Sequence, residues 1–221
     1  MTEYRVARQF MIRHDKSQIL TKSIYSKRQS RWKVAMFEGK VYDQTVPCQQ
    51  VRFGRCVKST VRCLLLRSLQ REHPSSNLTL HLHGGGYISQ SPEFHQVYLN
   101  EWAKTLKGNG LRLVNSTVLT QSIADTTILS VDYSLSPEAP YPEALQEVLD
   151  CYLWLVTGDP EVEAAIGFHP TKIAICGDSA GGNLGMALVL ALNDIRQTVK
   201  QYGGSLDGYP FPSGLFCFYT P

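Results

Sequence analysis

Gly177-Asp178-Ser179-Ala180-Gly181 is the stretch that decides the fold of this 221-residue chain. It lies between a short apolar run, Lys172–Cys176, and a long apolar helix predicted over Ala180–Lys200. A G-x-S-x-G turn between a strand and a helix is typical of a nucleophile elbow, which projects a serine from the edge of a sheet. Because the chain reverses sharply there, we expect a side chain at Gly177 or Gly181 to collide with the neighbouring helix or strand. Ser179 is the candidate nucleophile, at a helix N-terminus whose dipole favours developing negative charge.

Two other interpretations of this turn stay open, a plain glycine-rich turn and a phosphate-binding loop. The phosphate interpretation lacks support, because the G-x-G-x-x-G order is absent and no Walker Gly-Lys-Ser/Thr follows. Asp178 is taken as support for the motif rather than as a catalytic group.

A second glycine motif, His83-Gly84-Gly85-Gly86-Tyr87, follows the alternating stretch Leu78–His83. An H-G-G-G run after a strand is typical of an oxyanion-hole loop, because consecutive glycines let backbone N–H groups turn inward. We expect the N–H groups of Gly85 and Gly86, together with that of Ala180, to hold the oxygen of a tetrahedral intermediate. The ring of His83 would orient the loop and not shuttle protons. A tight, flexible turn is the alternative.

The rest of the chain alternates between strand and helix signals. Apolar spacing predicts that Leu145, Leu149 and Tyr152 share the inner face of one helix, and that Val97, Trp102 and Leu106 lie near one face of another. The pattern indicates an α/β fold with a mostly parallel sheet covered by helices on both faces. Predicted strands occupy 50–57, 60–66, 78–83, 127–133, 172–176 and 215–219, and predicted helices occupy 94–106, 142–156 and 180–200.

Charge is uneven along the chain, whose net charge is +3. Residues 1–72 carry +11 and residues 73–221 carry −8. We therefore divide the chain into a basic leader, 1–45, and a catalytic domain, 46–221, in which 108–127 is a possible surface insertion. The basic part suits an anionic lipid surface, an acidic partner or a plain solvated face. A nucleic-acid partner is not expected, because no zinc finger, RNP or heptad-plus-basic pattern accompanies the charge.

Targeting and cofactor signals are few. The longest apolar run, Met186–Leu192, has 7 residues, whereas a membrane span needs about 20. The N-terminus has charges where a signal peptide needs an apolar core, and a mitochondrial presequence stays an alternative. The six cysteines lack metal-site spacing and are expected to be reduced thiols. No metal and no cofactor are expected.

Together these stretches resemble the hormone-sensitive lipase family of α/β hydrolases. The resemblance rests on HGGGY at 83–87, DYSLSPEAPYPEAL at 132–145 and GDSAGGNLGMAL at 177–188. Ser134, where many bacterial members have Arg, makes the animal members the most similar. The resemblance implies an esterase or lipase acting on lipid esters, in the cytoplasm and at lipid droplets. It also implies Ser179 as nucleophile and Gly85, Gly86 and Ala180 as oxyanion donors.

The catalytic pattern breaks after Ser179. In this fold the order along the chain is Ser, then Asp or Glu, then His, yet no histidine follows Ser179. Only Asp194 and Asp207 follow as acids, and neither lies where the family places its acid. We expect a C-terminally incomplete catalytic domain that lacks the last strands and is inactive by itself. A ligand-binding or regulatory protein on a hydrolase scaffold and a fragment without function are the alternatives.

Overall fold

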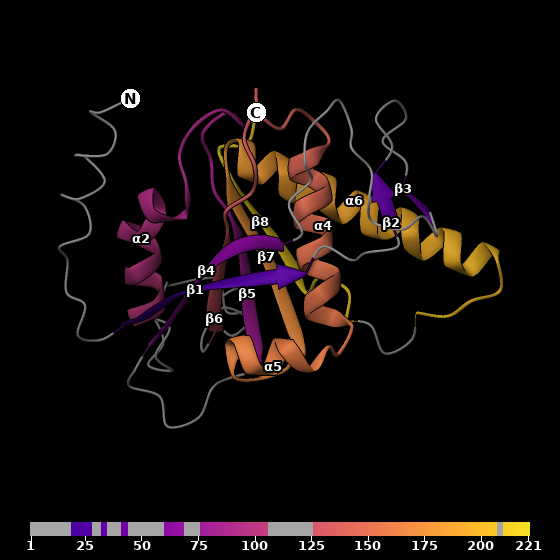
Figure 1. Cartoon of the computed structure of the whole chain (residues 1–221), viewed down its shortest axis with the longest axis horizontal. Helices are drawn as coiled ribbons and strands as arrows, with labels where there is room; N and C mark the ends of the chain where they lie inside the picture. Colours follow the sequence, from indigo (N-terminus) through magenta and orange to yellow (C-terminus); the bar gives the residue numbers. More distant parts are fainter. Residues whose placement is uncertain are drawn as a thin grey trace, which may run out of the picture.

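A six-stranded mixed sheet forms the centre of the chain (Figure 1). The computed structural model describes residues 19–27, 32–34, 41–43, 60–68, 76–105, 126–206 and 210–221. The strands lie in the order β1-β4-β6-β5-β7-β8. Their bounds are β1 (Ile19–Lys27), β4 (Thr60–Ser68), β5 (Asn77–Leu82), β6 (Thr126–Val131), β7 (Lys172–Asp178) and β8 (Gly214–Phe218). A separate antiparallel pair joins β2 (Trp32–Val34) to β3 (Val41–Asp43).

The four strands β6, β5, β7 and β8 run parallel, whereas β4 is antiparallel to both of its neighbours. Parallel neighbours need crossover connections, and helices supply them. Their bounds are α2 (Pro92–Thr105), α4 (Glu143–Val156), α5 (Pro160–Ile166) and α6 (Ala180–Gln201). The mostly parallel sheet predicted from the sequence is confirmed for the described part of the chain.

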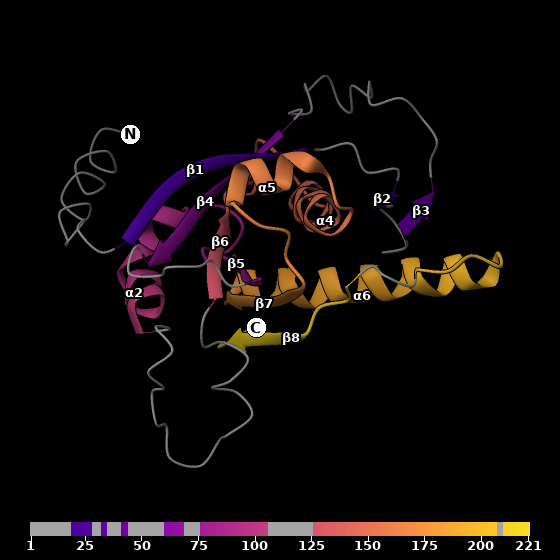
Figure 2. The same ribbon diagram turned by 90° about the horizontal axis from the view of Figure 1, so that it is seen from below.

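Helices cover both faces of the sheet, and each face has its own apolar core (Figures 1 and 2). The alternation along β4 shows the division. Cys63 and Leu65 belong to the larger core, where Cys63 contacts Cys151 of α4, whereas Leu64 and Leu66 pack with Leu99 of α2. Both sets are buried because side chains alternate between the two faces of a strand that is covered on each side.

The helix predictions had different outcomes. Leu145, Leu149 and Tyr152 are all buried on α4, as predicted. On α2 the prediction is wrong for Val97, which is 59% exposed, whereas Trp102 is partly buried against the smaller core. The buried stripe is instead His95, Leu99 and Ala103, at spacings of four residues. Because a histidine is a member of this stripe, the spacing of apolar residues alone did not identify the buried face. Leu106, the third residue of the predicted face, lies outside the described residues.

One helix, α5, was not predicted from the sequence. Its start is fixed by Asp159, whose side chain accepts a hydrogen bond from the Glu161 N–H at 2.9 Å, and by Pro160 at the first helical position. Its end is Gly167, in the left-handed conformation at φ 89°. These end signals were available in the sequence, but the helix has only 7 residues and a weak periodicity.

The N-terminal part of the chain contributes to the main sheet. Residues 19–27, placed by the sequence in the leader 1–45, form β1 and pair with β4 along its length. The division at residue 46 therefore does not coincide with an edge of the sheet. The strand expected at 50–57 lies outside the described residues, as do 1–18 and most of the possible insertion at 108–127. The last two residues of that insertion, Thr126 and Thr127, begin β6.

Replacing Leu149 by alanine should lower the free energy of unfolding by about 2–5 kcal/mol, because its side chain is fully buried under the sheet. The matched control is Leu190→Ala on α6, where the leucine is 69% exposed and the change should stay within about 0.5 kcal/mol. Urea unfolding followed by circular dichroism measures both. Equal losses in the two variants would contradict the placement of α4.

Candidate active site

Ser179 occupies a strained turn between β7 and α6. Its backbone has φ 49° and ψ −119°, in a region that L-residues rarely adopt. Such a conformation costs on the order of 1–3 kcal/mol and persists only where the surroundings enforce it. Two backbone hydrogen bonds do so here: the Ser179 N–H donates to the Phe218 carbonyl at 2.9 Å, and the Asn183 N–H donates to the Ser179 carbonyl at 3.1 Å.

The two flanking glycines are required by close packing. A Cβ atom on Gly177 would lie 2.5 Å from the Gly181 backbone, at the start of α6. A Cβ atom on Gly181 would overlap the carbonyl oxygen of Leu82, at the end of β5. The predicted collisions with helix and strand are therefore confirmed.

The glycine loop after β5 is a turn that only glycine adopts easily. Gly85 has φ 124° and Gly86 has φ 63°. The Gly85 carbonyl accepts hydrogen bonds from the N–H groups of Ile88 and Ser89, at 3.2 and 3.1 Å. Neither the Gly85 nor the Gly86 N–H makes a hydrogen bond with any residue that the structure describes. These two donors are therefore available for an oxygen atom of a ligand.

The side chain of His83 supports this loop. Its ring is buried and stacks on Tyr133 at 4.2 Å between centroids, and its Nδ1 atom donates to the Gly84 carbonyl at 2.8 Å. The Tyr133 hydroxyl in turn donates to the His83 carbonyl at 2.6 Å. Burial lowers the pKa of His83 to about 4, so the ring is neutral at physiological pH. These contacts suit a ring that orients the loop.

The segment after β6, residues 132–137, also contacts this loop. The Ser136 N–H donates to the Tyr87 carbonyl at 2.8 Å. The segment is itself fixed by two carboxylates. Asp132 accepts from Arg62 Nε at 2.7 Å, and the buried Glu147 accepts from the Ser134 hydroxyl at 2.8 Å.

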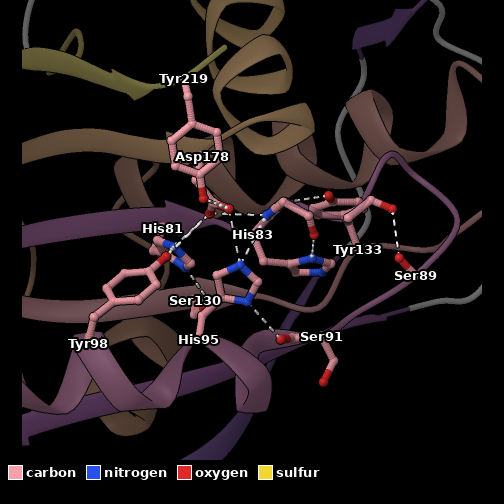
Figure 3. A network of polar contacts seen from close by, with 12 residues as sticks. His81, His83, Ser89, Ser91, His95, Tyr98, Ser130, Tyr133, Asp178 and Tyr219 are labelled. Carbon is pink, nitrogen blue, oxygen red and sulfur yellow. Dashed lines mark hydrogen bonds and ion pairs between the residues drawn. The ribbon is translucent and has the colours of Figure 1, made fainter. Parts of the chain in front are cut away.

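Asp178 connects the two glycine motifs (Figure 3). Its Oδ1 atom accepts the Gly84 N–H at 3.1 Å. Tyr219, which follows β8, donates its hydroxyl to Oδ2 at 3.0 Å, and His95 Nε2 of α2 lies 3.2 Å from the same oxygen. Tyr98, also of α2, donates to Oδ1 at 3.3 Å. One carboxylate thus contacts the glycine loop, α2 and the end of β8.

No histidine is placed as a base for Ser179 among the described residues. His81, His83 and His95 belong to the network around Asp178, and none of them hydrogen-bonds Ser179. His169 precedes β7 and therefore lies at the opposite end of that strand, 3.6 Å from Glu163. The remaining two, His14 and His73, lie outside the described residues.

A family model of the α/β-hydrolase fold matches residues 116–214. The chain thus has the α/β-hydrolase fold. Known structures agree: the chain superposes on fungal esterases from Rhizomucor miehei with a TM-score of 0.58 at 22% identity, over 99% of this chain and 51% of that one. It superposes on an esterase from Pyrobaculum calidifontis with a TM-score of 0.54 at 19% identity, over 94% of this chain and 46% of that one.

The hydrolase sequences that resemble this chain are lipases and esterases. Hormone-sensitive lipase of Bos taurus is 35% identical over 150 residues, which are 67% of this chain and 17% of that protein. Hormone-sensitive lipase of Homo sapiens is 34% identical over 141 residues, 64% of this chain and 11% of that protein. An esterase of Acinetobacter venetianus is 30% identical over 124 residues, which are 56% of this chain and 32% of that protein. The chain therefore spans less than a third of the length of each of these relatives.

The electrostatics of the site centre on Asp178. Burial by itself would raise the pKa of this carboxyl, but His81, whose Nε2 lies 3.8 Å from Oδ1, and hydrogen bonds from His95 and Tyr219 outweigh burial and hold its pKa well below the usual range. The carboxylate is therefore charged at neutral pH. Burial and the nearby charge of Asp178 raise the pKa of Tyr98, which stays protonated and can donate.

Sequence reasoning found the loop, the elbow and Asp178, but it missed His81, His95, Tyr98 and Tyr219. The available signal was weak: two polar residues, His81 and His95, at positions where the strand and helix periodicities require a buried side chain. A buried histidine needs hydrogen-bond partners, and only the fold shows that Asp178 is one of them.

In the described part of the chain, no helix is long and apolar enough to cross a membrane. The same part holds no group of three or more His, Cys, Asp or Glu residues suited to a metal ion.

Asp178→Asn should lower the free energy of unfolding at pH 7 by about 1–3 kcal/mol, because a charged hydrogen-bond acceptor is lost. The pKa of Asp178 is lower in the folded chain, so this stabilisation is present above the ordinary aspartate pKa and is lost as the pH falls below it. The difference between wild type and variant should therefore shrink between pH 5 and pH 3, as about 3.9 is the ordinary value. Urea unfolding at several pH values measures it.

The control for this experiment is Glu138→Gln, which removes the same charge from an exposed position on the neighbouring segment. We expect a change within about 0.5 kcal/mol at every pH. A difference between wild type and Asp178→Asn that stays constant or grows on acidification would contradict the charged state of Asp178.

Proposed function

We propose that this chain carries the nucleophile and the oxyanion hole of a carboxylic ester hydrolase that acts on lipid esters. The observation that supports it most is that Asp178, next to Ser179, is hydrogen-bonded to Gly84, next to the two glycines with free N–H groups. A strained serine and a pair of unpaired N–H donors are thereby held at one edge of the sheet. Acyl transfer to a serine uses such a nucleophile beside oxyanion donors.

In the proposed reaction, Ser179 Oγ attacks the ester carbonyl carbon and forms a tetrahedral intermediate. Its oxyanion accepts hydrogen bonds from the N–H groups of Gly85, Gly86 and Ala180, each of which is worth about 3–4 kcal/mol to the transition state. The N-terminus of α6 adds a favourable dipole behind Ser179. The alcohol then leaves, and water hydrolyses the acyl-serine.

A base must take the Ser179 proton, and this sequence has no histidine after Ser179. We therefore propose that the 221-residue chain by itself turns esters over slowly. Without a triad base, the oxyanion hole and substrate binding give about 10³–10⁴-fold acceleration over water. The preference for lipid esters rests on the resemblance to hormone-sensitive lipases.

An external base should reveal the nucleophile. We expect an alkyl fluorophosphonate to label Ser179 faster when imidazole is added. The serine oxygen bonds to phosphorus, fluoride leaves, and imidazole takes the proton that no triad histidine accepts. Mass spectrometry of the intact chain and of the peptide containing Ser179 measures the rate and the site of labelling.

Ser179→Ala should abolish this labelling. The control, Ser205→Ala, changes an exposed serine after the far end of α6, about 33 Å along the helix, and should label like the wild type. Labelling that persists in Ser179→Ala would overturn the assignment of the nucleophile.

A second function deserves a test because no histidine follows Ser179. The same N–H donors would hold an ester or carboxylate ligand without turnover, as in a receptor built on a hydrolase scaffold. Calorimetry with a non-hydrolysable short-chain ester analogue separates the two functions. Saturable binding without imidazole-dependent labelling of Ser179 would favour the receptor, whereas labelling favours the hydrolase.

The basic residues 1–72, with a charge of +11, are proposed to bring the chain to an anionic lipid surface. Binding to vesicles that contain phosphatidylserine should weaken as salt is raised from 50 to 500 mM, as expected for screened charges with a Debye length of about 10 Å at 0.1 M. Sedimentation of the chain with vesicles measures it, and neutral vesicles are the control. Binding that ignores salt would contradict an electrostatic surface.

A further inference from the structure

We infer that two contacts, Gly84 to Asp178 and Tyr87 to Asn183, fix the oxyanion loop against Ser179, which makes Asp178 and Tyr87 positioning residues. This inference rests on the proposed hydrolase function. It adds that the position of the donors is set by side chains on either side of the nucleophile, and not by the glycines themselves.

The first contact lies before the nucleophile and is buried. Asp178 is 7% exposed, and its Oδ1 atom accepts the Gly84 N–H at 3.1 Å. The packing leaves no room for adjustment, because a Cβ atom on Gly84 would overlap the Asp178 carboxylate. A charged acceptor makes a stronger hydrogen bond than a neutral one, and the effect is greatest where water is excluded.

The second contact lies after the nucleophile. The Tyr87 hydroxyl donates to Asn183 Oδ1 at 2.7 Å. Asn183 belongs to the first turn of α6, and its own N–H donates to the Ser179 carbonyl at 3.1 Å. Tyr87 has φ 64°, which is unusual for a residue other than glycine. The contact with Asn183 therefore holds the end of the loop in an unfavourable backbone conformation.

These contacts bracket the two glycines whose N–H groups are free. Gly84 and Tyr87 are anchored, whereas Gly85 and Gly86 between them lack side chains that could anchor them. Glycine loses more conformational freedom on ordering than any other residue. Anchored ends remove much of that freedom before the substrate arrives, and a displacement of about 1 Å at a reacting group can cost 10²-fold in rate.

Other side chains keep the Asp178 carboxylate from turning away. Tyr219 and His95 lie at 3.0 and 3.2 Å from Oδ2, and Tyr98 donates to Oδ1 at 3.3 Å (Figure 3). Tyr98 is itself 2.8 Å from His81 Nε2. The orientation of one oxygen toward Gly84 is thus enforced from three directions.

The test compares Asp178→Asn and Tyr87→Phe, which keep the size and shape of each side chain. Imidazole-assisted fluorophosphonate labelling of Ser179 is followed over a range of probe concentrations, at a temperature where both variants are folded. Asp178→Asn should lower the maximal labelling rate about 10- to 100-fold, and Tyr87→Phe about threefold to tenfold, with the half-saturating probe concentration unchanged. A residue that only stabilises the fold would not produce this split.

Matched controls are Asp194→Asn in the middle of α6 and Tyr202→Phe at its end, where the tyrosine is 82% exposed. Both should label like the wild type. The amide signals of Gly84, Gly85 and Gly86 in ¹H–¹⁵N spectra give a second readout that needs no chemistry. Asp178→Asn should move the Gly84 signal upfield, speed its hydrogen exchange and shift the signals of the two glycines that follow.

The two readouts separate the inference from the function. If the wild-type chain is not labelled at Ser179, the proposed function is contradicted. The glycine signals would still show whether Asp178 holds the loop. Unchanged glycine signals in both variants would overturn the inference. So would a labelling rate that falls only in proportion to the folded fraction.

Discussion

The hydrogen bond from the Gly84 N–H to the Asp178 carboxylate is the constraint on which the site depends. It joins a loop that follows β5 to a turn that follows β7, two segments 94 residues apart in the chain. A buried carboxylate must be paired to remain charged, and this one takes its partners from the glycine loop, from α2 and from the end of β8. The need to satisfy one charge therefore holds together the elements that the proposed chemistry requires.

Sheet register makes this bond possible. In the parallel pair β5–β7, Leu82 lies opposite Gly177, so both strands end at the same level. Each strand is then followed by its glycine motif, and Gly181 packs directly on the Leu82 carbonyl. A side chain at this point would push the elbow away from the loop. The close approach of the two backbones brings the elbow beside the loop, and the Asp178 and Tyr87 side chains then fix the loop there.

The arrangement combines strain with preorganisation. Ser179 and Tyr87 both have positive φ angles, and both are held by hydrogen bonds to α6 or β8. The surrounding sheet supports these conformations, because its central strands β5, β6 and β7 are buried on both faces and bonded to neighbours on both sides. The histidines of the network are structural members of this support. A proton acceptor for Ser179 is a separate requirement of the proposed chemistry.

The sequence by itself determined the fold class, the elbow and the loop, because these depend on local rules: glycines where no side chain fits, a serine between strand and helix, and apolar periodicity. It predicted the sharp turn at Ser179 and the close packing at Gly177 and Gly181 for those reasons. It could not find the partners of Asp178, since hydrogen bonds between residues far apart in the chain leave no local pattern. It also misjudged the buried face of α2, where His95 occupies an interior position. Tertiary structure alone decided which polar groups meet. A buried charge must be hydrogen-bonded, and its partners are the groups that the fold brings near it, wherever they lie along the chain.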